Sequence, residues 1–125
     1  MLKKRLIGVV IVKDGWAMQS FGYRRYLPLG RPEVMVQNLD RWGADEILIQ
    51  CIDRSAYGLG PDLDVLDKIS KLSIATPLIY AGGICGREDA VKVVKHGADR
   101  IMVDAIVWDS HNCLNPFLVT LVLRR

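Results

Sequence analysis

The sequence predicts an α/β protein in which strands and helices alternate and the strands run parallel. Short apolar segments rich in β-branched residues recur along the chain, and each is followed by a segment whose apolar residues fall at helical spacing. No hairpin signal separates these segments, so we expect right-handed crossovers between the strands. The chain has 125 residues, half of them apolar, which is enough for a single domain, residues 1–125, with a buried core.

The first unit begins with a strand and ends with a helix. Residues 6–12 form a continuous β-branched run, as expected for a strand buried on both faces. A long polar and aromatic connection, residues 13–30, follows, and it is expected either to cover a ligand or to pack on the rim of the sheet. The apolar spacing after Pro32 predicts a helix that runs up to the stop signal Gly43.

The remaining units repeat this pattern. Residues 46–52 predict the second strand, and Asp62 is expected to open the helix that follows it. Two further pairs are predicted: a strand at 76–83 with a helix at 87–97, and a strand at 98–106 with a helix at 115–125 that Asn115 and Pro116 begin.

Charge and cysteine content exclude several classes of protein. The net charge is +3 and the basic residues are scattered, so the sequence lacks the basic stripe that is typical of nucleic-acid-binding proteins. Three cysteines without CxxC spacing favour a reducing compartment over a disulfide framework. The apolar runs at 6–12 and 117–123 are too short for a signal peptide or a membrane span. We therefore expect a cytoplasmic protein that binds neither nucleic acid nor membrane.

Parallel strands of this kind form either an open doubly wound sheet or part of a closed barrel. An open sheet has edge strands, which usually carry a proline, a bulge or a lysine that blunts the edge. No predicted strand shows such a device. We therefore expect barrel geometry.

Several segments resemble, in order and spacing, the cyclase subunit of imidazole glycerol phosphate synthase of histidine biosynthesis: MLKKRLIGVVIVKDG, LGRPE, WGADEILI, PLIYAGGI, GADRIMVDAIV and NPFLVT. They also resemble cyclase-like proteins that serve amidino-sugar pathways of surface polysaccharides. The resemblance covers nearly the whole chain and implies a TIM (β/α)8 barrel of about twice this length, built from two similar halves. The chain is therefore expected to be a (β/α)4 half-barrel that stops in its fourth helix because the other half comes from elsewhere.

A half-barrel leaves two strand edges and one apolar concave face without a partner. Burying roughly eight inward side chains from two halves, at about 1.5–3 kcal/mol each, outweighs an association cost of about 4–15 kcal/mol. We therefore expect a homodimer, in which strand 4 of one copy lies beside strand 1 of the other. Two alternatives are a non-catalytic scaffold that keeps only self-association, and a chain that completes its barrel with a different half or with a glutaminase-like subunit.

The resemblance implies a phosphate site where the strands end. Gly82 and Gly83, followed by a helix, are expected to offer backbone N–H groups to a phosphorylated, phosphosugar-like small molecule. The alternative is a tight turn that merely needs glycine. Relatives hold the phosphate with an amide and a hydroxyl at the places of Asp104 and Ala105, so we assign Ala105 to this site, although the Asp104 carboxylate would repel a phosphate dianion.

The candidate catalytic residues are three carboxylates at the strand ends, Asp14, Asp53 and Asp104. A carboxylate near a barrel mouth acts as a general acid or base when its surroundings move its pKa toward neutrality. The alternative for Asp53 is a solvated loop pair with Arg54. Any activity is expected to be of the lyase or cyclase kind.

Besides the change at Asp104 and Ala105, three further departures from the family pattern weaken the enzymatic interpretation. Ile11 stands where relatives have the inward catalytic aspartate of the first strand, and isoleucine cannot transfer a proton. Cys51 stands at the carboxylate place of the second strand, and Gln19 matches a lysine of the first loop. Cyclisation in histidine biosynthesis is therefore not expected, and the sequence leaves open whether any activity is retained.

At the opposite end of the strands, Arg5, Glu46 and Arg100 occupy places where relatives form a charged gate for ammonia from a glutaminase. The alternative, which we favour, is a structural salt-bridge layer that closes the barrel floor.

The other reactive side chains give weak signals. Neither His96 nor His111 is placed to activate Cys51 as a nucleophile. His96 is expected in the last turn of a helix, where a cation suits the helix dipole. His111 and Cys113 lack the further ligands of a zinc site, so we expect neither a metal nor another cofactor.

Overall fold

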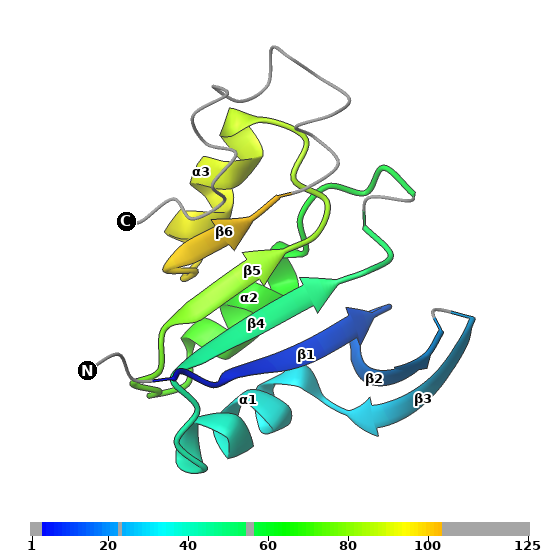
Figure 1. The fold of residues 1–125 in the computed structure, drawn as a ribbon. Helices are drawn as coiled ribbons and strands as arrows, with labels where there is room; N and C mark the ends of the chain where they lie inside the picture. The colour runs from blue at the N-terminus through cyan, green and yellow to red at the C-terminus, as the bar shows by residue number, and fades with distance from the viewer. Residues whose placement is uncertain (1–3, 23, 55–56, 104–125) are drawn as a thin grey trace.

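The computed structural model describes residues 4–22, 24–54 and 57–103 (Figure 1). These residues form one sheet with three helices. The strands are β1 (Ile7–Lys13), β2 (Trp16–Phe21), β3 (Arg25–Gly30), β4 (Glu46–Cys51), β5 (Leu78–Ala81) and β6 (Arg100–Met102). The helices are α1 (Pro32–Arg41), α2 (Leu63–Ser70) and α3 (Arg87–Lys95).

The sheet has the strand order β3-β2-β1-β4-β5-β6. Strands β1, β4, β5 and β6 are parallel neighbours. One helix connects each successive pair, α1 after the hairpin that follows β1, α2 after β4 and α3 after β5. The prediction of an α/β fold with parallel strands joined by helical crossovers is therefore confirmed.

The connection predicted at residues 13–30 is a hairpin, and the expectation of no hairpin is wrong. Strand β2 pairs antiparallel with the end of β1, and β3 pairs antiparallel with β2. Asp14 and Gly15 form the turn between β1 and β2 with φ of 53° and 78°. Positive φ at both central residues is typical of a type I′ turn, which Asp-Gly favours. The Asp14-Gly15 dipeptide is therefore the feature of the sequence that indicates the hairpin.

The hairpin also corrects the expectation that no strand carries an edge device. Pro28 lies within β3, and the pairing of β2 with β3 is irregular between Ala17 and Met18. A proline and a bulge at the outer strand discourage further pairing there. Since β2 pairs only with Ile11–Lys13 of β1, Ile7–Val10 have no partner from β2 on that side.

The helices begin close to the predicted positions, for the predicted reasons. Pro32 occupies the first turn of α1, where its missing N–H costs nothing. The Asp62 carboxylate accepts a hydrogen bond from the Val65 N–H at 3.2 Å and so caps α2. The fourth predicted strand is described only to residue 103, and the helix expected at 115–125 lies outside the described residues.

The two faces of the sheet differ. The face toward the helices is buried in the main core, which includes Val10, Val12, Ile49, Tyr80 and Ile101. We call the other the open face. Following the strand register, its side chains are those of Ile7, Val9, Ile11, Glu46, Leu48, Gln50, Ile79, Ala81, Arg100 and Met102.

No described helix lies over the open face in Figure 1. Leu48, Ile79 and Ala81 are nevertheless buried in a small cluster of their own at its centre. Ile7 and Val9 are 50% and 51% exposed, and Met102 is 36% exposed. The apolar surface left on this face is therefore concentrated toward its two outer parallel strands.

Within the described ranges, no helix combines the length and apolar content that crossing a membrane requires.

One aspartate joins α1 to the segment that leads into β5. Oδ1 of Asp40 accepts hydrogen bonds from the Thr76 hydroxyl at 2.6 Å, the Thr76 N–H at 3.1 Å and the Ala75 N–H at 3.2 Å. These hydrogen bonds, the one from the Thr76 hydroxyl most strongly, hold the pKa of Asp40 below its usual value. The contact connects α1 of the first βα unit to the loop between α2 and β5 at the N-terminal end of the sheet.

An Asp40→Asn variant is expected to be less stable than the wild type near neutral pH, because the charged acceptor is lost. The lowered pKa means that the folded state prefers ionised Asp40, so its stabilisation is present above the unfolded pKa and disappears as pH falls through the folded pKa. The difference in melting temperature should therefore shrink below about pH 4. Thermal denaturation from neutral to acid pH measures it. Asp64→Asn, on the exposed side of α2, is the matched control, and an equal loss in both variants would contradict this role.

Candidate functional site

The C-terminal ends of β1 and β4 bring two predicted catalytic carboxylates into one region. Asp14 lies in the hairpin turn, and Asp53 follows β4 with only 7% of its surface exposed. Oδ2 of Asp53 accepts a hydrogen bond from the backbone N–H of Asp14 at 3.0 Å. Asp53 thus holds the turn against the β4 loop, which gives this buried carboxylate a structural role. The proposed catalytic role of either residue stays a prediction.

Arg54 shapes the loop between β4 and α2. Its Nε donates to the Gly60 carbonyl at 2.8 Å, and its Nη2 donates to the carbonyls of Leu59 and Pro61 at 3.1 and 3.3 Å. A guanidinium that satisfies three carbonyls in sequence fixes the path of the loop. The solvated pair of Asp53 with Arg54 is therefore not the arrangement found, because each side chain binds a different backbone segment.

Gly82 and Gly83 lie where β5 meets this loop, with φ of 128° and 72°. A Cβ on Gly82 would lie 2.4 Å from the Cys51 carbonyl oxygen, and one on Gly83 would lie 2.2 Å from the Gly60 carbonyl oxygen. Both positions require glycine for backbone conformation and for close packing. The tight-turn interpretation explains both glycines without a ligand, and the phosphate cradle stays a prediction.

The turn before α3 already carries a carboxylate. Oδ2 of Asp89 accepts the Cys85 N–H at 3.0 Å, and Glu88 also lies in the first turn of the helix. Negative side chains at a helix N-terminus are favourable in themselves and compete with an external anion. The other predicted residues, Asp104, Ala105, His111 and Cys113, lie outside the described residues.

Cys51 belongs to the core and not to the open face. It is 2% exposed, and burial raises the pKa of its thiol to about 12. Its neighbour Tyr80 is fully buried, accepts the Asp62 N–H at 2.7 Å and also has a raised pKa because of burial. A thiol in this environment remains protonated and is a poor nucleophile.

The open face near the strand ends is formed mainly by uncharged side chains. Ile11, at the place of the expected catalytic aspartate, pairs in register with Met18 of β2 and Gln50 of β4. Gln50 in turn pairs with Ala81. Sequence analysis missed Gln50, although strict alternation along β4 would have identified it, because Ile47, Ile49 and Cys51 all face the core.

A lysine does lie near this end of the sheet. Lys13 pairs with Trp16, and its Nζ lies 4.4 Å from the centre of the Tyr26 ring, a cation–π contact. Gln19, which matches a family lysine in sequence, is exposed and pairs with Leu27. By alternation it points away from the face that carries Met18. Lys13 was not singled out from the sequence because the hairpin was not recognised.

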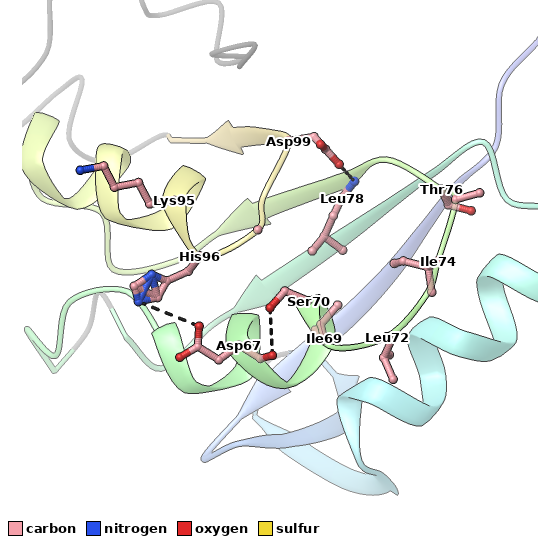
Figure 2. Close-up of a pocket in the computed structure, with 12 residues that line it drawn as sticks. Asp67, Ile69, Ser70, Leu72, Ile74, Thr76, Leu78, Lys95, His96 and Asp99 are labelled. Carbon is pink, nitrogen blue, oxygen red and sulfur yellow. Dashed lines mark hydrogen bonds and ion pairs between the residues drawn. The ribbon is translucent and has the colours of Figure 1, made fainter.

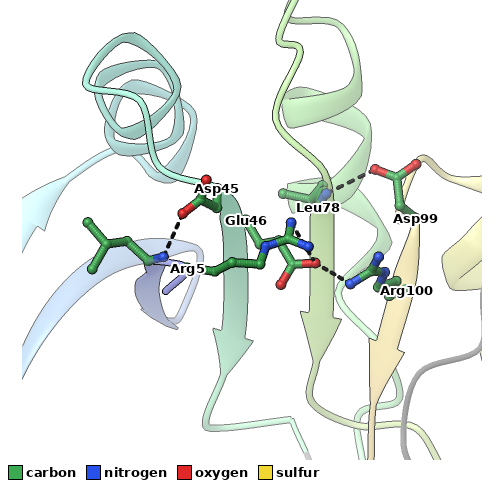
Figure 3. Close-up of polar contacts among 7 residues, drawn as sticks. Arg5, Asp45, Glu46, Leu78, Asp99 and Arg100 are labelled. Carbon is green, nitrogen blue, oxygen red and sulfur yellow. Dashed lines mark hydrogen bonds and ion pairs between the residues drawn. The ribbon is translucent and has the colours of Figure 1, made fainter. Parts of the chain in front are cut away.

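The three charged residues predicted at the N-terminal end converge there (Figure 3). We call Arg5, Glu46 and Arg100 the floor cluster. Arg5 Nη2 lies 3.6 Å from Glu46 Oε1, and Arg100 Nη1 binds the same oxygen. The Glu46 side chain is 8% exposed, whereas the Arg5 side chain is 56% exposed. The structure therefore contains the predicted salt-bridge layer, and the gate interpretation stays untested.

One hollow in the described residues lies away from the C-terminal ends of the strands. It measures about 550 Å³ and is lined by residues from the last turns of α2 and α3 and from the segment that leads into β5 (Figure 2). His96 ends α3, as predicted, and its Nε2 lies 4.0 Å from Asp67 Oδ1. Ser70 and Asp99 are already hydrogen-bonded to backbone groups of the chain. These contacts explain the hollow as a junction between helices.

Comparisons with known proteins identify similar sequences. A family model described as Histidine biosynthesis protein matches residues 11–112. The chain is 32% identical over 120 residues to imidazole glycerol phosphate synthase subunit HisF of Aliivibrio fischeri, covering 96% of this chain and 44% of that protein. The same subunit of Staphylococcus carnosus is also 32% identical over 120 residues, with 95% and 44% covered. That of Natranaerobius thermophilus is 31% identical over 105 residues, with 84% and 41% covered.

The chain thus spans less than half the length of these curated relatives.

The environment of Cys51 predicts selective thiol reactivity. With a pKa near 12, against 9.0 for an ordinary thiol, the thiolate fraction of Cys51 falls on the order of a thousandfold. In a Cys113→Ser background, Cys85 should react rapidly with a thiol reagent in the native protein and Cys51 only after unfolding. Single-cysteine variants that retain one of the two, assayed with and without denaturant, separate the thiols. Equal native rates would contradict the burial of Cys51.

Proposed function

This chain belongs to the histidine biosynthesis protein family, and we propose that it acts as a cyclase-like half-barrel that pairs with a second copy and binds a phosphorylated small molecule. In this proposal two copies complete one TIM barrel, and the ligand lies at the C-terminal ends of the strands. The apolar exposure of the open face is the observation that carries it.

The exposed residues lie where a second copy would be needed. The most exposed apolar side chains of the open face are those of Ile7 and Val9 on β1 and Met102 on β6. They stand on the two outer strands of the parallel set, with the buried cluster of Leu48 and Ile79 between them. A barrel interior, filled by layers of side chains, would bury all of these residues.

The available strand edge fits the same assembly. The side of β1 away from β4 is paired with β2 only at Ile11–Lys13, so Ile7–Val10 can accept another strand. Strand β6 has β5 as its neighbour on one side in the described sheet. A two-fold rotation places β6 of one copy beside β1 of the other, in the parallel orientation that the rest of the sheet has.

The proposed ligand site combines backbone N–H groups with the positive charge of a lysine. Gly82 and Gly83 supply the turn before α3, and Ala105, which the resemblance assigns to the same site, lies outside the described residues. Lys13 adds a positive charge near the same end of the sheet. A phosphate group would be recognised by backbone N–H groups and this ammonium. The Asp89 carboxylate limits the negative charge that the site can accept.

A non-catalytic scaffold is the second candidate, and the open face favours it. Among its described side chains, Glu46 is the one carboxylate, and it lies at the floor. Ile11 and Gln50 stand at the opposite end, where acid–base chemistry would be expected. Asp53 binds the Asp14 N–H, so its best-defined role is structural. Lyase chemistry in this protein would therefore depend on Asp104 or on a partner, including a glutaminase-like subunit.

The dimer is tested by a charge on the open face. Val9→Asp should shift the protein from dimer to monomer, because two aspartates would be buried without a partner in the closed barrel. Light scattering across a dilution series measures the mass. Val91→Asp is the matched control: Val91 is 45% exposed on α3, and its change should leave the dimer intact. Circular dichroism confirms that both variants fold. A folded wild-type protein that stays monomeric at micromolar concentration, in chloride and in phosphate alike, would contradict the proposal.

Phosphate binding is tested separately by titrating inorganic phosphate into labelled protein. The amide resonances of Gly82 and Gly83 should move together and saturate, because their N–H groups would donate to the anion. A Lys13→Met variant should bind more weakly while keeping its native spectrum. Amide shifts that grow linearly with phosphate, or that appear only elsewhere, would favour the scaffold.

A further inference from the structure

The floor cluster has more positive than negative charge. Two guanidinium groups, from Arg5 and Arg100, bind a single oxygen of a single carboxylate. The three side chains of the cluster together carry one net positive charge, and the carboxylates of the neighbouring Asp45 and Asp99 are hydrogen-bonded to the backbone N–H groups of Leu6 and Leu78. No other ion pair of Arg5 or Arg100 is recorded within the described part of the chain.

The orientation of the cluster matters because all three residues belong to the open face. Glu46 and Arg100 begin β4 and β6, and alternation along each strand puts them on the same face as Leu48 and Met102. Arg5 precedes β1 and reaches Glu46 from the neighbouring strand (Figure 3). Whatever covers the open face therefore encloses this excess charge.

A second copy doubles the excess charge and does not cancel it. Two-fold symmetry brings identical surfaces together, so the closed floor would contain two copies of each of the three residues. The closed floor would then carry two positive charges that Glu46 does not balance, in one layer under an apolar interior. Taking such charges out of water is unfavourable unless a counter-charge is present.

We propose that the floor of the homodimer is a binding site for a doubly charged tetrahedral oxyanion, inorganic phosphate being the simplest, and that this anion stabilises the dimer. The inference rests on the proposed homodimer. Guanidinium groups present paired N–H donors that match the oxygens of such an anion. A dianion held by Arg5 and Arg100 of both copies neutralises the excess charge. This site is distinct from the one proposed at Gly82 and Gly83, because it lies at the other end of the strands.

The site is tested by measuring the dimer dissociation constant in sodium chloride and in sodium phosphate at equal ionic strength. By mass action, about 10 mM phosphate should lower the dissociation constant about tenfold if the anion binds with millimolar affinity. Analytical ultracentrifugation over a dilution series gives both values. Equal dissociation constants in the two salts would overturn the proposal.

Arg5→Gln separates this effect from other anion effects. Arg5 is largely exposed, so the variant is expected to fold, and it removes the excess charge from each copy. Its dimer should be at least as tight as the wild type in chloride and should not respond to phosphate. Arg41→Gln changes the net charge equally on exposed α1 and should keep the full response.

The outcomes distinguish the two proposals. A dimer whose phosphate response survives in Arg5→Gln overturns the floor site but leaves the homodimer intact. A wild-type protein that stays monomeric in both salts overturns both. A monomer in chloride that becomes a dimer in phosphate, with the response absent in Arg5→Gln, supports both.

Discussion

Successive side chains of a β-strand point to opposite faces of the sheet, and the described helices cover only one of these faces. This constraint organises the whole structure. Residues on the helix side are almost entirely buried, and the alternate residues form the open face. The strands nevertheless read as continuous apolar runs, because the alternate positions are also apolar. A strand such as β4 therefore has apolar side chains on both faces, although helices cover only one of these faces.

Much of this organisation could be predicted from the sequence. Helix α2 was predictable because Asp62 caps it and its apolar residues share one face. Other features required knowledge of side-chain direction. Cys51 and Gln50 are adjacent in sequence but face different surroundings, and only the pairing register shows which one enters the core. The hairpin was missed because residues 13–30 were interpreted as one connection, and the hairpin signal of Asp14-Gly15 within it was not recognised.

The N-terminal end of the sheet shows how a repeated motif produces a repeated contact. The tripeptide Gly-Ala-Asp ends both the first and the third unit. Asp45 exchanges two hydrogen bonds with Leu6, one from each backbone N–H, and Asp99 does the same with Leu78 (Figure 3). Each aspartate therefore aligns the start of one parallel strand with the start of its neighbour. Both segments resemble motifs of the family, but only the hydrogen bonds of the folded chain reveal that their aspartates align the strands.

The same arrangement explains why polar chemistry is unequal at the two ends of the open face. The aligned strand starts place Glu46 and Arg100 on one level, so their ion pair follows from the register of the sheet. At the other end, the same alternation directs Ile11 and Gln50 onto the open face while Asp53 is held by the hairpin turn. Within the described residues, the open face therefore carries its ion pairs at the N-terminal end and mainly uncharged side chains at the C-terminal end, so one strand register produces both the charged floor and the uncharged surface around Ile11 and Gln50.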